Sequence, residues 1–299
     1  MSAPWQWDET LYAGAAPFYL AGRRPYPQAI PGLLAERLGL DGSGALLDVG
    51  CGPGSLTLLL APLFRRTVGI DADAGMVAAA SERAELAGAG QVSFRQLRAE
   101  ELPAGLGTFQ LVSFAQSFHW TSQLQVAGTV RQMIEPGGAC LLLYGATSDG
   151  AEGNGQLAYP YPPRAAIGTL VGRYLGPVRR AGRGQRPGFR LDGDAMRQAG
   201  FDGPERIEAG GGEVWQRSED EVVASVFSLS WSAPGLFGDR RADFERELRA
   251  LLRDASPDGW FCEVSRPIAI DLWRPPDRAA SGTSADRDTG SSAGRPHRG

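Results

Sequence analysis

The stretch ALLDVGCGPGSLTLLLA contains an acid and three glycines with the spacing of a cofactor site. A second acid follows at the end of the next expected strand. Gly50, Gly52 and Gly54 alternate with other residues behind Asp48, and Asp71 comes about 20 residues later. Glycine lets the backbone bend sharply and approach a ligand closely. An acid in the position of Asp71 can accept hydrogen bonds from ribose hydroxyls. The spacing therefore indicates a cofactor that contains a nucleoside.

The glycine spacing also separates two classes of cofactor. A dinucleotide fold uses G-x-G-x-x-G, which counted from Gly50 requires a glycine where this chain has Ser55. A carboxylate at Asp48 would repel a pyrophosphate and would suit a ligand with a cationic amino group. The turn therefore favours an aminoacyl nucleoside, and an NAD-dependent oxidoreductase remains the less favoured alternative.

The elements that must position these residues alternate between strand and helix. Short apolar runs predict strands at 45–49, 66–71, 92–97, 109–115 and 135–144, and helical patterns fill 31–38, 55–64, 73–87 and 124–134. Such alternation is typical of parallel βαβ units. We therefore expect an α/β, Rossmann-like, doubly wound fold with a seven-stranded, mostly parallel sheet, whose cofactor site lies at the carboxyl ends of the strands.

The chain outside this alternation contains an N-terminal segment, an insertion, two further helices, a last strand and a C-terminal tail. Residues 1–30 are aromatic and proline-rich and are expected to close over the cofactor site of the main domain, 31–275. Residues 146–192 are turn-rich and basic and are expected to form an inserted lid. Helices are expected at 218–231, with Ser218 as N-cap, and at 240–255. One last strand is expected at 260–273, at an edge or bulge because it contains Pro267. Residues 276–299 are expected to be disordered.

The composition excludes several classes of function. The chain has 34 acidic and 30 basic residues, a net charge of −4, which argues against nucleic acid as a partner. All basic residues are arginine, so lysine chemistry is excluded. The three cysteines lack metal-ligand spacing, so no metal is expected, and they fit a reducing cytoplasm. The N-terminus has no signal-peptide pattern, and no apolar run is long enough to predict a membrane span.

His119 is the one histidine in the body of the chain. It follows the strand expected at 109–115, at the carboxyl edge where a substrate would meet the cofactor. An unperturbed imidazole pKa of about 6.5 suits a general base at neutral pH. The alternative interpretation is that His119 positions the substrate or forms part of the pocket wall.

Several motifs resemble one family. LLDVGCGPG and VGIDADAGMVAAA are similar to the first two motifs of class I S-adenosylmethionine (SAM) dependent methyltransferases, and RAEELP, FQLVSFAQSFHW and IEPGGACLLLY fit the next three. AQSFHW and GRRPYP most resemble the methyltransferase type 11 branch, which includes trans-aconitate methyltransferase-like enzymes. The resemblance covers about residues 8–145 well. Arg98 departs from the family pattern. Many relatives have an aspartate at this position, and its carboxylate accepts a hydrogen bond from the adenine amino group. An arginine side chain has no acceptor and cannot form this bond.

The resemblance implies a role for each matching residue. The methionine part of SAM would be surrounded by Asp48, Gly50, Cys51, Gly52, Gly54 and Gln116. The ribose would be bound by Asp71, and the adenine would be flanked by Ala72, Met76, Ala99 and Glu100. Tyr19 and Arg23 would close over the cofactor from the N-terminal segment.

The implied activity is transfer of a methyl group from SAM to a small molecule, with oxygen favoured over nitrogen or carbon as acceptor, to give S-adenosylhomocysteine. Secondary metabolism is the setting that the family suggests. The main alternative is a methyltransferase fold that binds SAM without methyl transfer, as a cyclase or a binding protein. We expect a monomer or homodimer in the cytoplasm, with no membrane partner.

Overall fold

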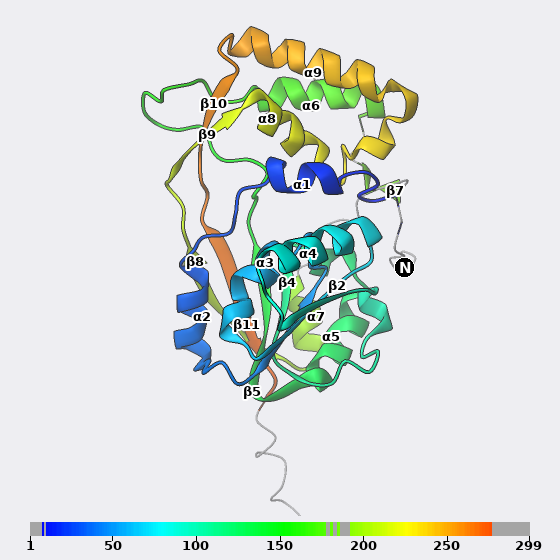
Figure 1. Ribbon diagram of the computed structural model, residues 1–299, viewed down its shortest axis with the longest axis vertical. Helices are drawn as coiled ribbons and strands as arrows, with labels where there is room; N and C mark the ends of the chain where they lie inside the picture. The colour runs from blue at the N-terminus through cyan, green and yellow to red at the C-terminus, as the bar shows by residue number, and fades with distance from the viewer. Residues whose placement is uncertain (1–7, 9, 178–179, 182–183, 186–191, 277–299) are drawn as a thin grey trace, which may run out of the picture.

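The computed structural model describes the chain except for residues 1–7, 9, 178–179, 182–183, 186–191 and 277–299. The expected disordered segment therefore lies almost wholly outside the described residues, as do parts of the expected lid and N-terminal segment. Figure 1 shows an α/β layer at the bottom of the view, a helical layer at the top, and α1 (Ala16–Gly22) between them.

A seven-stranded sheet forms the centre of the α/β layer. From one edge to the other its strands are β3 (Val92–Gln96), β2 (Arg66–Asp71), β1 (Ala45–Val49), β4 (Phe109–Ala115), β5 (Ile134–Tyr144), β11 (Ile268–Arg274) and β8 (Asp202–Ala209). Strands β1 to β5 are mutually parallel, and β11 runs antiparallel to both of its neighbours. The expected seven-stranded, mostly parallel, Rossmann-like sheet is confirmed.

Helices cover both faces of this sheet, which is why its central strands are apolar on both sides. All five residues of β1 are buried. One face packs on α5 (Gln123–Met133) and α7 (Asp192–Gln198). The other face packs on α2 (Ile30–Leu38) and α3 (Ser55–Leu60). The sequence of a strand that is buried on both faces is a continuous apolar run, without the alternation of apolar and polar residues that a half-exposed strand has. The remaining helix of this layer, α4 (Ala74–Leu86), contacts β2 and β3.

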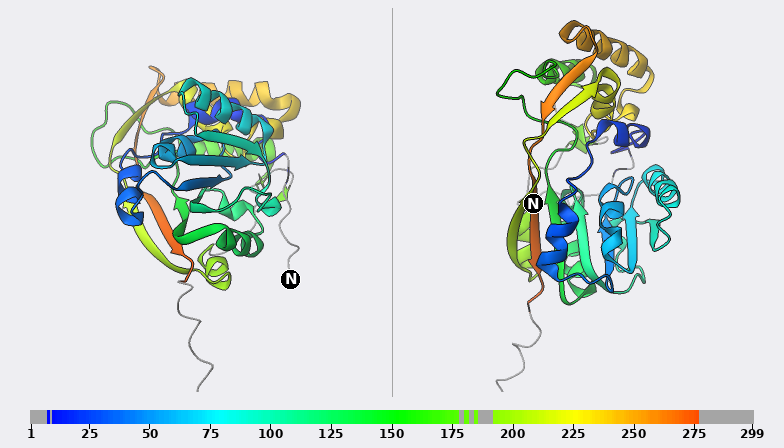
Figure 2. Two further views of the ribbon diagram at one scale, coloured as in Figure 1. Left: turned by 60° about the horizontal axis from the view of Figure 1, so that its bottom comes forward. Right: turned by 60° about the vertical axis from the view of Figure 1, so that its left-hand side comes forward.

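A second layer, which we call the cap, covers the carboxyl edge of the sheet (Figure 1; Figure 2, right). The cap consists of α6 (Arg164–Leu175), β9 (Val214–Ser218), α8 (Glu219–Phe227), α9 (Arg241–Ala255) and β10 (Trp260–Val264). It has its own hydrophobic core, built around side chains such as Phe227, Phe244 and Phe261. Ser218 is the N-cap of α8, as expected, and forms a capping box with Glu221.

Short elements complete the described part of the chain. The 3-10 helices are η1 (Ala61–Leu63), η2 (Ala99–Glu101), η3 (Phe118–Trp120), η4 (Pro234–Leu236) and η5 (Gly238–Arg240). Two two-residue strands, β6 (Arg180–Ala181) and β7 (Gly184–Gln185), pair with one another. Within the described ranges, no helix is long and apolar enough to cross a membrane.

The expectation of one last strand containing Pro267 is wrong. The segment forms two strands in different sheets: β10 pairs with β9 in the cap, and β11 pairs with β5 and β8 in the main sheet. Pro267 lies between them and belongs to neither. Proline has no N–H to donate to a ladder, so pairing ends before it. In the main sheet β11 is not at an edge, because β8 occupies that position, but its pairing with β8 is irregular between Leu272 and Arg274, and β10 has β9 as its one partner in the two-stranded sheet.

The chain leaves and re-enters the main sheet at neighbouring points. It leaves at Tyr144, the end of β5, and again at Ala209, the end of β8. It returns at the start of β11, where Ala269 pairs with Tyr144 and Ile268 pairs with Ala209. The connections between sheet and cap therefore meet at one place on the carboxyl edge.

Candidate functional site

The turn after β1 uses three glycines in backbone conformations that other residues rarely adopt. Gly50, Gly52 and Gly54 have φ angles of +67°, +54° and +75°. A Cβ on Gly50 would lie 2.4 Å from the Cβ of Ser117, so glycine there lets this turn pack against the turn after β4. A Cβ on Gly52 would meet nothing within 4 Å. The Gly52 position therefore keeps space open in front of the turn.

Asp71 fixes this glycine turn from the neighbouring strand. Its Oδ2 accepts the backbone N–H of Gly52 at 2.8 Å, and its Oδ1 accepts that of Asp73 at 2.9 Å. Burial raises the pKa of the Asp71 carboxyl group above its ordinary value. Each carboxylate oxygen can accept a further hydrogen bond, so Asp71 keeps acceptor capacity for a ligand.

A cleft of about 690 Å³ opens beside these groups. It lies beyond the carboxyl ends of β1, β2 and β4, where the strand order reverses, because β1 leads to β2 and β3 on one side and β4 leads to β5 on the other. The residues expected at the cofactor that line it are Tyr19, Gly50, Gly52, Asp71, Ala72, Met76, Ala99, Glu100 and Gln116. The structure thus brings together side chains from α1, the first two strand ends, η2 and the turn after β4.

A smaller cavity of about 340 Å³ adjoins the cleft and shares Tyr19, Gly50 and Ala115 with it. Two further expected residues, Arg23 and Cys51, line this second cavity. Arg23 donates to the hydroxyl and carbonyl oxygens of Ser228, each at 2.9 Å, and its guanidinium lies 4.7 Å from the centre of the Tyr19 ring.

Sequence reasoning missed Arg24, which also lines the second cavity. Its side chain is 14% exposed, and its ion pair with the largely exposed Glu213 is 3.5 Å long. Burial lowers the pKa of Arg24, so a closer anion would stabilise its charge. The motif GRRPYP contains both arginines, because Arg24 directly follows Arg23.

Asp48 lies away from the ligand position that was expected for it. Its side chain is 0% exposed and lines neither cavity. It accepts hydrogen bonds from Thr57 Oγ1 at 2.5 Å and from Ser113 Oγ at 2.7 Å. Burial raises the pKa of Asp48 to about 6. The structure therefore gives Asp48 the role of joining β1 to α3 and β4 beneath the site.

Gly54 and His119 also line neither cavity. Gly54 is the N-cap of α3, and a Cβ there would lie 3.0 Å from the Phe94 ring. The His119 imidazole is half-buried in η3, with its centre 4.7 Å from that of the Trp120 ring. Trp120 does line the cleft, so His119 contacts a residue of the cleft wall without lining the cleft itself.

Several wall residues were not identified from the sequence as site residues. These are Val49, Leu97, Arg98, Ala115, Ser117, Trp120 and Thr121. Tyr12, from the aromatic N-terminal segment, also lines the cleft, and it is half-buried and packs against Trp120. Because these two aromatic residues are distant in sequence, no local pattern places them on one wall.

Gln116 has a feature that no sequence pattern could show. It is a non-glycine residue with φ of +57°, in the left-handed region, directly after β4. Such backbone strain is common at functional sites and persists where the surroundings fix it. Here its N–H donates to the carbonyl of Leu143 at 3.1 Å, and its side chain is hydrogen-bonded to Tyr26.

The acidic groups that were expected beside an adenine already form hydrogen bonds and an ion pair within the protein. Glu100 accepts the backbone N–H of Ser122 at 2.8 Å, and Arg98 pairs with Glu101. Within the part of the chain that the structure covers, no group of three or more histidine, cysteine or acidic residues could bind a metal ion.

The fold and the cleft define a class: an open α/β sheet with a glycine turn and a following acid beside a cleft at the switch point, which is where such sheets bind their ligands. The comparisons define the family. A family model described as a methyltransferase domain matches residues 46–138. This match includes the glycine turn after β1 and Asp71. Residues 46–138 therefore form a methyltransferase domain, and the resemblance to methyltransferases seen in the sequence is confirmed.

The curated relatives are methyltransferases that match part of the chain. An uncharacterised methyltransferase of Synechocystis, sll0829, is 30% identical over 145 residues, 48% of this chain and 64% of that protein. YcgJ of Bacillus subtilis, also an uncharacterised methyltransferase, is 29% identical over 113 residues, 38% of this chain and 45% of that protein. The chain thus covers less than two thirds of either relative. The structure of a type II methyltransferase proposed for Anaeromyxobacter dehalogenans aligns with a TM-score of 0.49 and 21% identity, over 84% of this chain and 94% of that one.

Proposed function

We propose that this protein binds SAM in the cleft and transfers its methyl group to a small molecule, with oxygen as the acceptor atom, releasing S-adenosylhomocysteine. One observation carries the proposal. Asp71 and the open glycine turn meet at the switch point of the sheet, inside the segment that matches the methyltransferase family.

The residues of the cleft fit the adenosine part of SAM. The open space in front of Gly52 accommodates a ligand against the backbone, and Asp71 has acceptor capacity for the ribose hydroxyls. Apolar side chains of Met76 and Leu97 suit the faces of a purine ring. Arg98 cannot accept the adenine amino group, so Glu100 or a backbone carbonyl is the acceptor there.

The second cavity fits the amino-acid end of SAM. Its charged lining residues are Arg23 and Arg24, and a carboxylate is the anion that a guanidinium binds most specifically. Arg24 is the better candidate because Arg23 already donates to Ser228. Tyr19 lines both cavities, so α1 covers the point where the two halves of the cofactor meet.

When bound, SAM supplies a methyl group activated by a positively charged sulfur. The contribution of the protein is alignment, because holding the acceptor in line with the methyl group can supply much of the rate. Tyr12, Tyr19 and Trp120 form an aromatic wall that excludes water from the cleft. His119 contacts Trp120 and is proposed to position the acceptor through it.

The pocket for the methyl acceptor is assigned to the cap and to two segments beside it, residues 1–30 and 146–192. We propose that residues 1–30 close over the cofactor and that the region 146–192 acts as a lid that shapes the acceptor pocket. The net charge of −4 favours a small molecule over a nucleic acid.

Titration calorimetry with SAM, S-adenosylhomocysteine and NAD tests the proposal. We expect binding of the two adenosyl ligands and a loss of affinity of roughly 100-fold in Asp71→Ala, which corresponds to about 2.7 kcal/mol. Asp254→Ala, which removes an exposed carboxylate on α9, is the matched control and should bind normally. Binding of NAD alone would assign the protein to the oxidoreductases.

A second assay separates methyl transfer from SAM binding without transfer. Purified protein is incubated with SAM and a panel of small hydroxyl, carboxylate and amine acceptors, and S-adenosylhomocysteine is measured. Turnover with an oxygen acceptor supports the proposal. Tight SAM binding without turnover on any acceptor of the panel would favour the binding or cyclase alternative.

A further inference from the structure

Arg217 is a charged residue in an unusual place. It lies on β9 in the cap, and its side chain is 0% exposed, as is that of Glu263, its partner on β10. A buried charge is tolerated only when its donors find acceptors. Which acceptors Arg217 uses therefore shows what this residue holds together.

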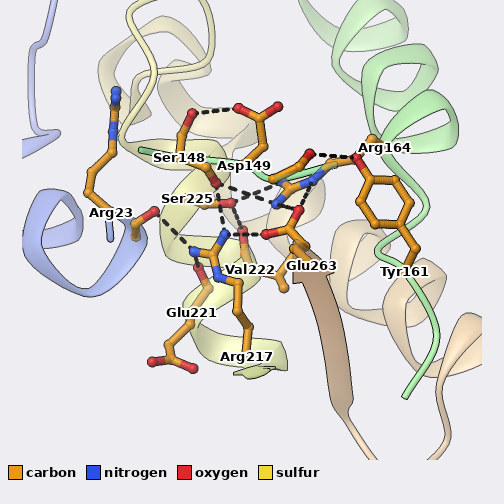
Figure 3. Close-up of polar contacts among 12 residues, drawn as sticks. Arg23, Ser148, Asp149, Tyr161, Arg164, Arg217, Glu221, Val222, Ser225 and Glu263 are labelled. Atoms are coloured by element: carbon orange, nitrogen blue, oxygen red, sulfur yellow. Dashed lines mark hydrogen bonds and ion pairs between the residues drawn. The ribbon is translucent and has the colours of Figure 1, made fainter. Parts of the chain in front are cut away.

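The guanidinium of Arg217 donates to three backbone carbonyls from separate parts of the chain (Figure 3). Nη2 donates to Gly22 at 3.0 Å and to Glu221 at 2.7 Å, and Nη1 donates to Ser148 at 2.8 Å. These carbonyls belong to the end of α1, the first turn of α8 and the segment after β5. One side chain thus joins the N-terminal helix to the cap and to the exit from the sheet.

Arg164 completes the cluster around Glu263. It donates to Glu263 Oε1 through Nη2 at 2.6 Å and Nε at 3.0 Å, and to the hydroxyl of Ser225 at 3.1 Å. Arg217 reaches the other carboxylate oxygen at 3.2 Å. Two guanidinium groups therefore share one carboxylate, and the backbone carbonyls compensate the remaining positive charge. Burial lowers the pKa of Arg217 to about 10, so it remains charged at neutral pH.

The end of α1 is in direct contact with α8. A Cβ on Gly22 would lie 2.4 Å from the carbonyl oxygen of Ala224, so only glycine allows this approach. The next residue, Arg23, donates to Ser228 just beyond α8. Among the described elements, α1 makes far more contacts with α8 than with α4, its neighbour in the α/β layer. Helix α1 is thus attached to the cap, although it covers the cofactor cleft.

We infer that Arg217 is a positioning residue for the cofactor cleft: by binding the carbonyl of Gly22 it fixes α1, and with it Tyr19, over the site. The inference rests on the proposed function, because Tyr19 covers the cleft assigned to SAM. Stabilising the cap alone would require only the contacts with Glu221 and Glu263. The contact with Gly22 reaches a segment 195 residues earlier in the chain and makes α1 and the cap one unit.

Two variants displace α1 by different routes. Arg217→Met removes the three carbonyl contacts and leaves Glu263 paired with Arg164. Gly22→Ala forces α1 away from Ala224 without changing any charge. The control is Arg249→Met, because Arg249 pairs with Glu219, Asp220 and Glu245 and so joins α8 to α9 entirely within the cap.

The measurements are amide hydrogen exchange of α1 in the ligand-free protein and S-adenosylhomocysteine affinity, both at a temperature where every variant is folded. We expect Arg217→Met and Gly22→Ala to accelerate exchange in α1 and to weaken binding by roughly tenfold, about 1.4 kcal/mol. Arg249→Met should lower the unfolding temperature and leave both readouts unchanged. Arg217→Lys, which keeps a charged donor, should partly restore both.

The outcomes separate the inference from the proposed function. Wild-type exchange in α1 together with wild-type affinity in Arg217→Met or Gly22→Ala would overturn the inference. Equal losses in Arg249→Met would also overturn it, because the effect would then be one of cap stability. If the wild-type protein binds no adenosyl ligand, the proposed function fails, and the exchange measurement alone then decides whether Arg217 fixes α1. If Arg217→Met does not fold, Gly22→Ala carries the test.

Discussion

The carboxylate of Asp71, at the end of β2, accepts the backbone N–H of Gly52, in the turn after β1, at 2.8 Å. This bond sets the shape of the glycine turn before any ligand arrives. It also brings the Asp71 carboxylate and the open face of the turn together beside the cleft. A substitution at Asp71 therefore acts on the cofactor and on the turn together.

The first prediction concerns how much of the proposed cofactor binding by Asp71 depends on the negative charge of its carboxylate. Asp71→Asn keeps one oxygen acceptor, whereas Asp71→Ala keeps none. We expect Asp71→Asn to weaken S-adenosylhomocysteine binding by roughly tenfold, less than Asp71→Ala, because hydrogen bonds to charged groups are about twice as strong as neutral ones. Calorimetry on both variants measures the difference. Equal affinities of wild type and Asp71→Ala would contradict the assignment of the ribose to Asp71.

The second prediction separates the two ends of the cofactor. Arg24→Met should weaken S-adenosylhomocysteine binding by roughly tenfold and leave 5′-methylthioadenosine binding unchanged, because that ligand lacks the amino-acid carboxylate. Asp71→Ala should weaken the binding of both ligands. Calorimetric titration of each variant with each ligand provides the comparison. If Arg24→Met weakened the binding of both ligands equally, the carboxylate would not be in the second cavity.

The third prediction concerns the open space in front of Gly52. Gly52→Ala places a Cβ in that space and in a left-handed conformation, and Gly88→Ala adds the same kind of strain at φ of +64°, on the exposed surface. We expect each to lower the free energy of unfolding by about 1–2 kcal/mol. Only Gly52→Ala should also weaken adenosyl-ligand binding, by roughly tenfold or more.

Urea unfolding and calorimetry on the same two variants measure these effects. If both variants bound the ligand as the wild type does, the cofactor would not approach the turn at Gly52. If Gly88→Ala weakened binding as much as Gly52→Ala does, the loss would come from general destabilisation.

The fourth prediction is a dependence of stability on pH. Burial raises the pKa of Asp48 from 3.8 to about 6, so between these values the folded protein binds more protons than the unfolded chain. The contribution of Asp48 to stability is therefore fully present below pH 3.8 and is lost as the pH rises through about 6. Each pKa unit corresponds to about 1.4 kcal/mol, which gives a loss of about 3 kcal/mol.

Asp71 and Asp192 also have raised pKa values, so the variant Asp48→Asn is needed to isolate this effect. An asparagine can still hydrogen-bond Thr57 and Ser113 but does not titrate. The difference in unfolding free energy between wild type and Asp48→Asn, measured in urea across this range, should change with pH. A difference independent of pH would show that Asp48 titrates normally in the folded protein.

The alternating elements of the α/β layer could be predicted because each strand–helix unit is local. The expected strand at 109–115 coincides with β4, and Asp71 lies where the spacing from Gly50 placed it. Glycine spacing and apolar runs report on backbone geometry that is decided within a few residues. For the same reason, the position of the first turn followed from the sequence.

The remaining features depend on contacts between distant segments. Whether Asp48 faces a ligand or the protein interior depends on Thr57 and Ser113, and no spacing rule includes them. Tyr12 and Trp120 meet only because α1 and its preceding turn fold back over the sheet. The division of 260–273 into β10 and β11 depends on the partner strand with which each half pairs. The apolar pattern alone contains no information about these partners, so it predicts a single strand.

The adjacent exits at Tyr144 and Ala209 and the return at Ile268 have a consequence for how such a protein can diversify. Because these points are neighbours on one edge, the segments that run from them into the cap can vary in length and sequence while every strand of the sheet keeps its partner and register. The family match ends at residue 138, before the first exit. Under the proposed function, the acceptor preference of such a protein can therefore change through the cap while the glycine turn and its bond to Asp71 stay as they are.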